Sequence, residues 1–474
     1  MNAIGKAPAA AAATAAGQTV TPWLTVVLAV ILLSGALFGY DQGVISGALH
    51  GIKATFSLSA LLVEVVTSWV TLGALFGALA GGELADRLGR KRAVLIAGVV
   101  FTAGSLIEAL APDTLILVGG RLIVGAGVGV AAVAAPLYAA ELAPSALRGR
   151  FISAYQLAVA GGIFIAYLVD GWLSKDDAWR WMLGLSAAPG LMLVAVALVT
   201  PQSPRWLMRM GRRTDAAAQM RKIRPDTDPS PGLDTIAAVL GQEKGRASWG
   251  EVFGKKWRRP LLVGVGLAVF QQITGINAII YYADQIFAAA GFATQSSQTT
   301  VTTWAVGGVN VGATLIAIAF IDRLGRRKLL LAGLLGMGLS LAVVGAAFVF
   351  MTTATVAHPA ATSTAGTVTL AALVVFIACF AFSMGPVVWT VINEIFPGHI
   401  RGRAVAVATA FNWASAFVVS QVFLSLIGAI GNSFTFWLFA LFCSLGWAFV
   451  FYRVPETKGR SLEQIQQIWK TKGA

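Results

Sequence analysis

Charge, cysteine and histidine are all scarce in this sequence. Only 12% of the 474 residues are charged, whereas a soluble domain carries roughly 25%. Because 57% of the residues are hydrophobic, the chain lacks the polar surface that several soluble domains would need. Its two cysteines, Cys379 and Cys443, lie in apolar segments, and its three histidines are scattered. So few cysteines and histidines predict neither a disulfide framework nor a metal site, and we expect no redox chemistry.

Motifs for nucleotide binding are missing as well. Gly125, Gly127 and Gly129 form a glycine-rich string, but no strand precedes it and no acidic residue follows at ribose-binding distance. No Walker motif is present for ATP-driven transport. We therefore interpret the glycines as sites of close helix packing, and we expect no cofactor and no enzymatic activity.

Apolar runs of about twenty residues recur along the chain, and each is long enough to cross the hydrocarbon core of a bilayer, which is about 30 Å thick. They predict an all-α membrane protein with twelve transmembrane helices. The predicted spans are 22–48, 61–84, 93–110, 115–138, 151–172, 179–200, 259–283, 299–321, 329–352, 368–392, 404–427 and 432–452.

The distribution of basic residues predicts the orientation. A net charge of +14 could indicate nucleic acid, but the basic residues fall in short clusters without a continuous basic face, so no nucleic-acid partner is expected. If the N-terminus is cytoplasmic, 31 of the 35 lysines and arginines lie inside, 3 lie outside, and Arg121 lies within a span. The positive-inside rule therefore predicts a multi-pass cell-membrane protein with both termini in the cytoplasm.

These patterns divide the chain into five segments. The one long loop contains helix-compatible stretches, and a loop of this length is usually structured. The predicted segments are a disordered cytoplasmic tail (1–21), a six-helix bundle (22–200), a cytoplasmic linker with short helices (201–258), a second six-helix bundle (259–453) and a cytoplasmic C-terminal tail (454–474).

Three loop motifs occur twice, once in each half. GELADRLGRKR is matched by FIDRLGRRK, ELAPSALRGR by EIFPGHIRGR and, more weakly, PQSPRWL by PETKGRSL. Each pair follows corresponding helices, so the halves are related by an axis along the membrane normal, as in a two-bundle carrier with its site between the bundles.

The repeated loops combine arginines with carboxylates. Keeping arginines on the cytoplasmic side of the membrane would not require the acidic partners, and the planar guanidinium binds carboxylates in a bidentate manner. We expect these groups to latch the two bundles together on the cytoplasmic side. The predicted latch residues are Asp86, Arg87, Arg90, Glu141, Arg148, Asp322, Arg323, Arg326, Glu394, Arg401 and Glu456.

With these motifs the sequence resembles the sugar porter family of the major facilitator superfamily, from Leu37 to Leu462. Further motifs that carry the resemblance are SPRWL, QQITGINAIIYY, GPVVW and PETKGRSLEQI. The resemblance implies the major facilitator fold, with the linker forming a cytoplasmic helical loop. One departure is Gln202, where the family usually has glutamate, and this puts one cytoplasmic charge contact in doubt.

Neutral amides and aromatic rings lie in the middle of otherwise apolar spans. Amides both donate to and accept from sugar hydroxyls, and rings cover the apolar face of a sugar, although a buried amide can instead join helices. The resemblance assigns most of the same positions to sugar binding. The predicted sugar ligands are Phe38, Gln156, Gln271, Gln272, Asn277, Asn310, Trp389 and Asn412. Bends at Thr274–Gly275 and at Gly385–Pro386 are expected beside them.

Asp41 and Arg121 are the clearest ionisable residues within spans. Counted at 1.5 Å per residue, both lie roughly 9–12 Å below the outer surface, so they can meet. Asp41 is the one acidic residue that the spans place deep in the membrane facing a buried arginine. The resemblance implies that family members with aspartate at the position of Asp41 are proton symporters. Facilitative members have a neutral residue at that position.

The sequence therefore predicts a monomeric carrier for the symport of a proton and a monosaccharide, either a hexose or a pentose, across the lipid bilayer by alternating access. Asp41 would accept the proton, and the charge of Arg121 would tune the pKa of Asp41. A facilitative sugar uniporter with the same site is the alternative, and a non-transporting sugar sensor is a weaker one, because the chain lacks the long cytoplasmic extension that sensors often carry.

Overall fold

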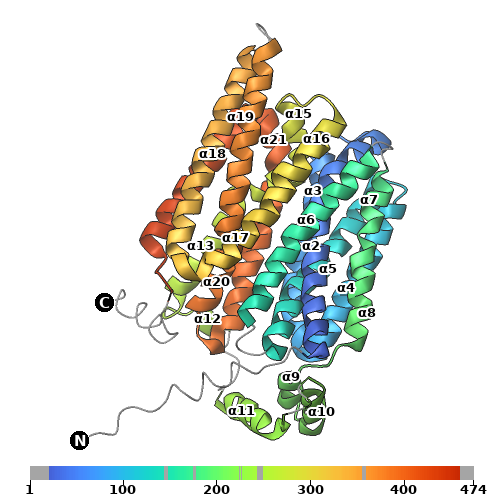
Figure 1. The fold of residues 1–474 in the computed structure, drawn as a ribbon, viewed down its shortest axis with the longest axis vertical. Coiled ribbons are helices and arrows are strands. Elements are labelled where there is room, and N and C mark those ends of the chain that lie inside the picture. Colours follow the sequence, from blue (N-terminus) through green and yellow to red (C-terminus); the bar gives the residue numbers. More distant parts are fainter. Residues whose placement is uncertain are drawn as a thin grey trace, which may run out of the picture.

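The chain folds into two bundles of long helices that stand side by side (Figure 1). The structure, a computed structural model, describes residues 21–458 apart from 144–147, 175–177, 224, 226, 243–248 and 355–358. Most of the two predicted tails therefore lies outside the described residues. The first bundle comprises α2 (Pro22–Phe56), α3 (Ala60–Leu88), α4 (Arg90–Leu110), α5 (Thr114–Leu142), α6 (Arg148–Leu173), α7 (Trp179–Leu185) and α8 (Ala187–Val199).

The second bundle has more interruptions than the first. Its elements are α13 (Arg258–Ile273), α14 (Ile276–Tyr281), α15 (Ala283–Ala289), α16 (Gln295–Val301), the π-helix η2 (Thr302–Gly308), α17 (Val309–Leu324), α18 (Arg326–Ala354), α19 (Pro359–Phe382), α20 (Met384–Ile395) and α21 (Gly398–Arg453). The linker forms α9 (Pro204–Arg209), α10 (Arg213–Ile223), α11 (Pro229–Gln242) and α12 (Trp249–Val252). Short helices were expected in this loop. Helices α9 to α11 lie beneath the first bundle in Figure 1, and we call this the linker end.

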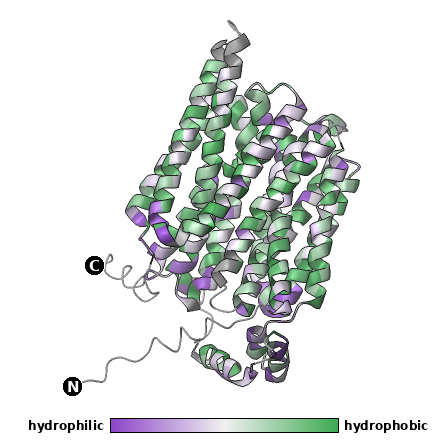
Figure 2. Ribbon diagram, viewed as in Figure 1, coloured by the Kyte–Doolittle hydropathy of each residue, from purple (hydrophilic) through white to green (hydrophobic). Residues whose placement is uncertain are grey.

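Within the described residues, eleven helical segments are long and apolar enough to cross a membrane. The last of them, Ile400–Arg453, contains a non-helical residue, Gly431, at which two helices meet. Counting these two separately gives the twelve predicted spans. Helix α3, with 29 residues, is about 43 Å long at 1.5 Å per residue, which exceeds the hydrocarbon core. The long helices are largely hydrophobic, while hydrophilic residues gather at helix ends and in α10 (Figure 2).

Two helix pairs in the first bundle pack backbone against backbone. Helix α2 lies along α6, and α3 lies along α5. A Cβ atom built on Gly39 would lie 1.9 Å from the carbonyl oxygen of Val159 on α6, and one built on Gly125 would lie equally close to that of Val70 on α3. Only glycine permits this approach. The glycine string in the fourth span therefore serves helix packing, as predicted.

The bundles meet through a few helices. Helix α3 packs on α21, α2 on α14, and α6 on both η2 and α17. One core cluster of buried side chains runs through both bundles and includes Tyr40, Tyr167, Tyr281 and Tyr282. The interface between the bundles is therefore where the predicted site residues have to be sought.

Candidate functional site

Three amide side chains form a hydrogen-bonded cluster between α13 and α21. Asn412 donates through Nδ2 to Oε1 of Gln271 at 2.8 Å, and its Oδ1 accepts from Nε2 of Gln272 at 3.2 Å. Gln271 also donates to the carbonyl oxygen of Met384 on α20, at 2.7 Å. All three amides are buried, but Oε1 of Gln272 has no hydrogen-bond partner among the described residues. The cluster thus joins three helices and keeps one buried acceptor available.

A second group of polar side chains links the two bundles. Gln42 on α2 donates through Nε2 to Oδ1 of Asn277 on α14 at 3.2 Å, and it lies 3.4 Å from the hydroxyl of Tyr281. Gln42 directly follows Asp41 in the chain, so a contact to the second bundle stands beside the buried charge. Asn277 was predicted as a sugar ligand, whereas Gln42 and Tyr281 were not. The signal for Gln42 was present, because it is an amide in an apolar span.

Aromatic rings and a further amide also bring the bundles together. Phe38 on α2 packs edge to face on Trp413 of α21, with ring centroids 5.3 Å apart. Gln156 on α6 reaches toward α20, where its Nε2 lies 3.6 Å from the position that a Cβ of Gly385 would take. The remaining predicted sugar ligands stand on two other helices of the second bundle, Asn310 on α17 and Trp389 on α20.

The predicted bend in the seventh span is present. Helix α13 ends at Ile273 and α14 begins at Ile276, and Gly275 between them has a φ of +93°. Only glycine adopts this backbone conformation without strain. The break turns the helix just after Gln271 and Gln272 and just before Asn277, so the amides lie on both sides of it.

The second predicted bend is displaced along the chain. It was expected at Gly385–Pro386, but the non-helical residue is Ser383, with φ −125° and ψ −81°, and α20 begins at Met384. Proline lacks an N–H and its ring crowds the carbonyl group four residues earlier, which here belongs to Phe382. The helix therefore breaks one turn before Pro386, at the residue following that carbonyl group.

Asp41 and Arg121 meet as predicted. Nη1 of Arg121 lies 2.6 Å from Oδ1 of Asp41, and the exposed fractions of the two residues are 0% and 3%. Nε of Arg121 donates to the carbonyl oxygen of Val66 on α3 at 3.1 Å. An ion pair with these distances inside a membrane-spanning bundle is a charge-assisted hydrogen bond shielded from water.

Asp41 is not the only acidic residue deep in the bundles, and that expectation was wrong. Glu108 on α4 is 1% exposed, and its Oε1 lies 3.7 Å from Nη1 of Arg121. Three more carboxylates are buried at or near the interface between the bundles: Glu64, Asp170 and Asp284. Sequence reasoning placed these residues near span ends, where carboxylates usually meet water, so their burial was missed.

Hydrogen bonds close the interface at the end opposite to the linker end. Glu64 on α3 accepts from the backbone N–H and from the hydroxyl of Ser425 on α21, each at 2.6 Å. Ser68 donates to Oε1 of Gln421 at 2.7 Å, one turn further along the same two helices. Tyr167 on α6 donates to the carbonyl oxygen of Ile280, at 2.9 Å. Side chains of the first bundle thus hold the second bundle at this end.

The carboxylate and arginine groups of the linker end form contacts within the first bundle. Arg90 on α4 binds Glu141 on α5 at 2.8 Å and Asp86 on α3 at 3.1 Å. Arg87 pairs with Glu83, one turn earlier on α3. The two contacts of Arg90 fasten the ends of three neighbouring helices to one another.

The second bundle repeats this arrangement. Arg326 on α18 binds Glu394 on α20 at 3.2 Å, and Glu456 accepts from the backbone N–H of Arg326 at 3.0 Å. Since each of these contacts also joins parts of one bundle, a latch between the two bundles through these groups stays a prediction.

The other predicted latch residues have varied surroundings. Arg401 donates through Nε to the carbonyl oxygen of Phe396, at 3.1 Å, in the turn between α20 and α21. The guanidinium of Arg323 lies over a phenylalanine ring of its own helix. The side chains of Arg148 and Asp322 lie outside the described residues.

Gln202 still makes a hydrogen bond at the position where the family usually has glutamate. Its Oε1 accepts from the backbone N–H of Lys91 at 3.2 Å, in the first turn of α4. Glu456 makes the equivalent contacts at the start of α18, to the N–H groups of Arg326 and Arg327. The amide therefore replaces the carboxylate as a hydrogen-bond acceptor without its charge.

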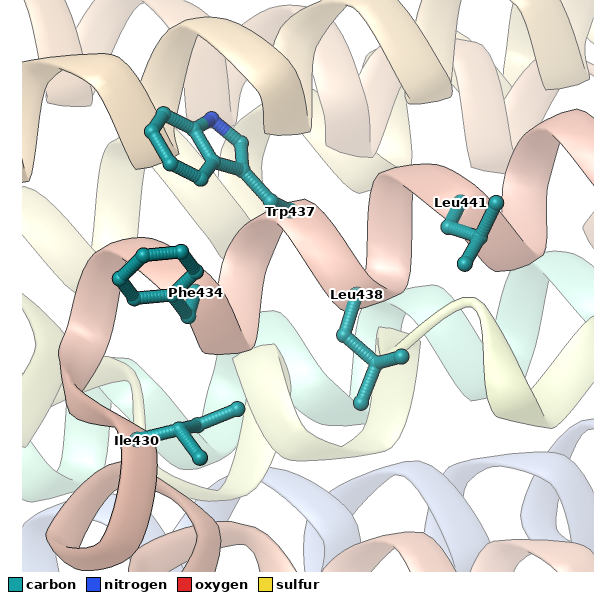
Figure 3. A pocket seen from close by; sticks show the side chains of 5 residues that line it. All are labelled: Ile430, Phe434, Trp437, Leu438 and Leu441. Atoms are coloured by element: carbon teal, nitrogen blue, oxygen red, sulfur yellow. The ribbon is translucent and has the colours of Figure 1, made fainter.

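A separate pocket lies on α21, near the bend at Gly431. It is lined by five apolar or aromatic side chains, which Figure 3 shows along one stretch of the helix: Ile430, Phe434, Trp437, Leu438 and Leu441. The indole N–H of Trp437 is already bonded to the carbonyl oxygen of Ala342. A lining of this kind suits hydrocarbon chains and offers no hydrogen bonds to a sugar, so the amide groups between the bundles are the better candidate site.

Comparison with known proteins gives a consistent picture. The family profile described as "Sugar (and other) transporter" matches residues 26–469. A galactose-proton symporter of Escherichia coli K12 is 39% identical, with 92% of each chain covered. An arabinose-proton symporter of Bacillus subtilis is 35% identical, covering 92% of this chain and 93% of that protein.

Solved structures agree over the same range. The xylose transporter of E. coli in a partially occluded inward-open conformation superposes with a TM-score of 0.79 at 30% identity, covering 93% of this chain and 100% of that one. The same proton:xylose symporter bound to 6-bromo-6-deoxy-D-glucose gives a TM-score of 0.78 at 32% identity, with coverages of 95% and 100%. The fold is that of membrane transporters.

Proposed function

Because the chain belongs to the sugar porter family of the major facilitator superfamily, we propose that it carries a monosaccharide, a hexose or a pentose, into the cell together with a proton. The observation that carries this proposal is the buried pair of Asp41 and Arg121 beside a polar link between the bundles. Gln42, the neighbour of Asp41, binds Asn277 across the interface. A change in the charge of Asp41 therefore acts directly beside the contact between the two moving halves.

The sugar binds among the predicted amides and rings between the bundles. Gln271, Gln272 and Asn412 supply donors and acceptors, and Oε1 of Gln272, which lacks a partner in the described part of the chain, is an acceptor for a sugar hydroxyl. Asn277 and Tyr281 lie beyond the break at Gly275, so movement of α14 adds their polar groups to a bound sugar or withdraws them. Phe38 and Trp389 cover the apolar face of the ring.

The proposed orientation follows from charge. The linker end carries the basic loops, and the positive-inside rule places it in the cytoplasm with both termini. Glu64, Ser68 and Tyr167 then close the outer side, so the arrangement described here is closed to the outside. Alternating access requires these contacts to open while the linker end closes.

Proton entry supplies the driving force. Protonation neutralises Asp41 and releases Arg121, and the site with sugar can then change sides. Inward movement of one proton is driven by about 2.3 kcal/mol per 100 mV of membrane potential, which corresponds to about 50-fold accumulation of sugar. The empty carrier returns after the proton has left to the cytoplasm.

The test is uptake of labelled sugars into proteoliposomes, with and without an imposed inward proton gradient, together with counterflow without a gradient. Galactose, arabinose, xylose and glucose are offered singly and in competition. Wild type should concentrate at least one of them only when the gradient is present. Asp41→Asn, which mimics the neutral carboxyl group, should show counterflow but no accumulation.

Other outcomes would decide between the alternatives. Wild type that exchanges sugar but ignores the gradient is a facilitative uniporter. Wild type that binds sugar without exchange or uptake is a sensor. If Asp41→Asn still accumulates sugar in a pH-dependent way, Asp41 is not required for coupling.

A further inference from the structure

Glu108 is a second buried carboxylate beside Arg121, and the coupling scheme above does not use it. Its Oε1 lies 3.7 Å from Nη1 of Arg121, the same nitrogen that lies 2.6 Å from Oδ1 of Asp41. A Cβ atom on Gly120 would lie 2.6 Å from Cγ of Glu108, so only the absence of a side chain there leaves room for this carboxylate. Both acidic side chains therefore approach one guanidinium nitrogen from different helices.

The surroundings of this trio contain few other charges. The charged or titratable groups facing it from the packed helices are Asp41 on α2, Arg121 on α5, Tyr281 on α14 and Arg180 on α7. Arg180 is partly exposed and donates to the carbonyl oxygens of Ala109 and Ala111. Helix α8 has no charged residue, and Glu64, the buried carboxylate of α3, is bonded to Ser425 instead.

The charges of the trio do not balance when both carboxylates are ionised. Asp41, Arg121 and Glu108 are each at most 3% exposed, so water does not solvate a net negative charge there. An uncompensated charge in such a place is strongly unfavourable. One bound proton makes the closed site neutral, and two carboxylates that share a site divide their protons between them.

The hydrogen bonds indicate which carboxylate holds that proton. Asp41 has the short charge-assisted bond to Arg121, as expected of an ionised group. Oε1 of Glu108 has no hydrogen-bond partner among the described residues, and an ionised oxygen would be costly there. In this arrangement Asp41 is the ionised partner and Glu108 is the protonated one.

We propose that Glu108 is a second proton-binding carboxylate of the carrier, and that the closed site carries one proton shared between Glu108 and Asp41 beside Arg121. The proposal rests on the proposed proton symport and deepens it. Closure of the site around bound sugar is favourable only when the three charges sum to zero, and with both carboxylates present this requires one proton. Neutralising either carboxylate by substitution gives a neutral site without any proton, and the carrier then cycles uncoupled.

The experiment compares Glu108→Gln with Glu108→Asp and wild type in proteoliposomes. Glu108→Gln should lose gradient-driven accumulation, down to the level without a gradient, and keep counterflow. Glu108→Asp keeps the acidic group and should keep both. Asp234→Asn makes the same carboxylate-to-amide change at an exposed residue of the linker helix α11 and should behave as wild type.

The outcomes separate this inference from the proposed function. If wild type ignores the gradient, proton coupling itself fails and the inference fails with it. If wild type accumulates sugar and Glu108→Gln does so equally, proton symport stands and the role of Glu108 is overturned. The double variant Asp41→Asn/Glu108→Gln leaves Arg121 without a carboxylate and should lose counterflow too. Full counterflow in that variant also overturns the proposal.

A second measurement does not depend on transport. Infrared spectra of the purified wild type should contain the carbonyl band of a protonated carboxyl group that Glu108→Gln removes and Asp234→Asn leaves unchanged. Should Glu108→Gln fail to fold, Glu108→Asp decides, because it shifts the band if Glu108 is the proton carrier. A band that is unchanged in Glu108→Asp contradicts the proposal.

Discussion

Glu64 on α3 accepts two hydrogen bonds from Ser425 on α21, one from its backbone N–H and one from its hydroxyl, each of 2.6 Å. The carboxylate is fully buried, and the two residues belong to different bundles. Opening of the end opposite to the linker end has to separate them. Glu64 therefore affects the equilibrium between the two conformations of the carrier.

Glu64→Ala should shift the carrier toward the conformation that is open at this end. Hydrogen bonds to a charged group contribute about 1.5–3 kcal/mol each, and the closed form alone contains these two. Distances between spin labels at the start of α3 and in α21 close to the bend at Gly431 measure the shift, with Asp234→Ala in the linker as the control. Identical distance distributions in Glu64→Ala and wild type would contradict the expectation.

Gln272→Ala should weaken sugar binding and leave the fold intact. The substitution removes a buried acceptor that has no hydrogen-bond partner among the described residues, at a cost of about 1–3 kcal/mol, or roughly 5- to 160-fold in affinity. Equilibrium titration of the purified protein with its best sugar measures the loss. Gln298→Ala, on α16, removes an amide outside the cluster and should bind as wild type. Unchanged affinity in Gln272→Ala would mean that this amide only joins helices.

Gly275→Ala should destabilise the protein by at least about 1–2 kcal/mol. Alanine is strained at a φ of +93°, and its Cβ would lie 2.7 Å from the ring of Phe439. Gly312→Ala on α17 is the matched control, because nothing lies within 4 Å of the added atom. Thermal unfolding in detergent compares the two, and equal midpoints would show that the break tolerates a side chain.

Gln202→Glu should stabilise the protein slightly. The oxygen of Gln202 accepts from the N–H of Lys91 in the first turn of α4, where a negative charge gains about 0.3–1 kcal/mol. Glu456→Gln should lose a similar amount at the start of α18, where the carboxylate already binds two N–H groups. The two variants should shift the unfolding midpoint in opposite directions, and salt should reduce both shifts. Shifts of the same sign would refute the electrostatic explanation.

Hydropathy predicted the number and order of the spans, because about twenty apolar residues match the bilayer whatever packs beside them. It also predicted the pairing of Asp41 with Arg121, since depth along a straight helix can be counted in residues. The break at Gly275 was predictable for a similar reason, because glycine weakens a helix locally. These features were predicted from the position of residues along the helices alone.

Features that depend on the rotation of a helix were not predictable. Glu108 lies two residues before the end of its predicted span, a place where carboxylates usually reach water. A helix that is apolar on nearly every side does not reveal which side faces lipid and which faces another helix. Burial of Glu64, Asp170 and Asp284 was missed for the same reason, since each carboxylate is bonded to a residue of another helix.

The glycine contacts of the first bundle restrict how the carrier can change shape. Where Gly39 rests on the carbonyl group of Val159, and Gly125 on that of Val70, the backbone ridges interlock and the helices cannot slide past each other. We therefore expect the pair α2 and α6, and the pair α3 and α5, each to move as one rigid body, so that the first bundle keeps its shape. The helix breaks at Gly275 and Ser383 both lie in the second bundle, and we expect bending during transport to occur there.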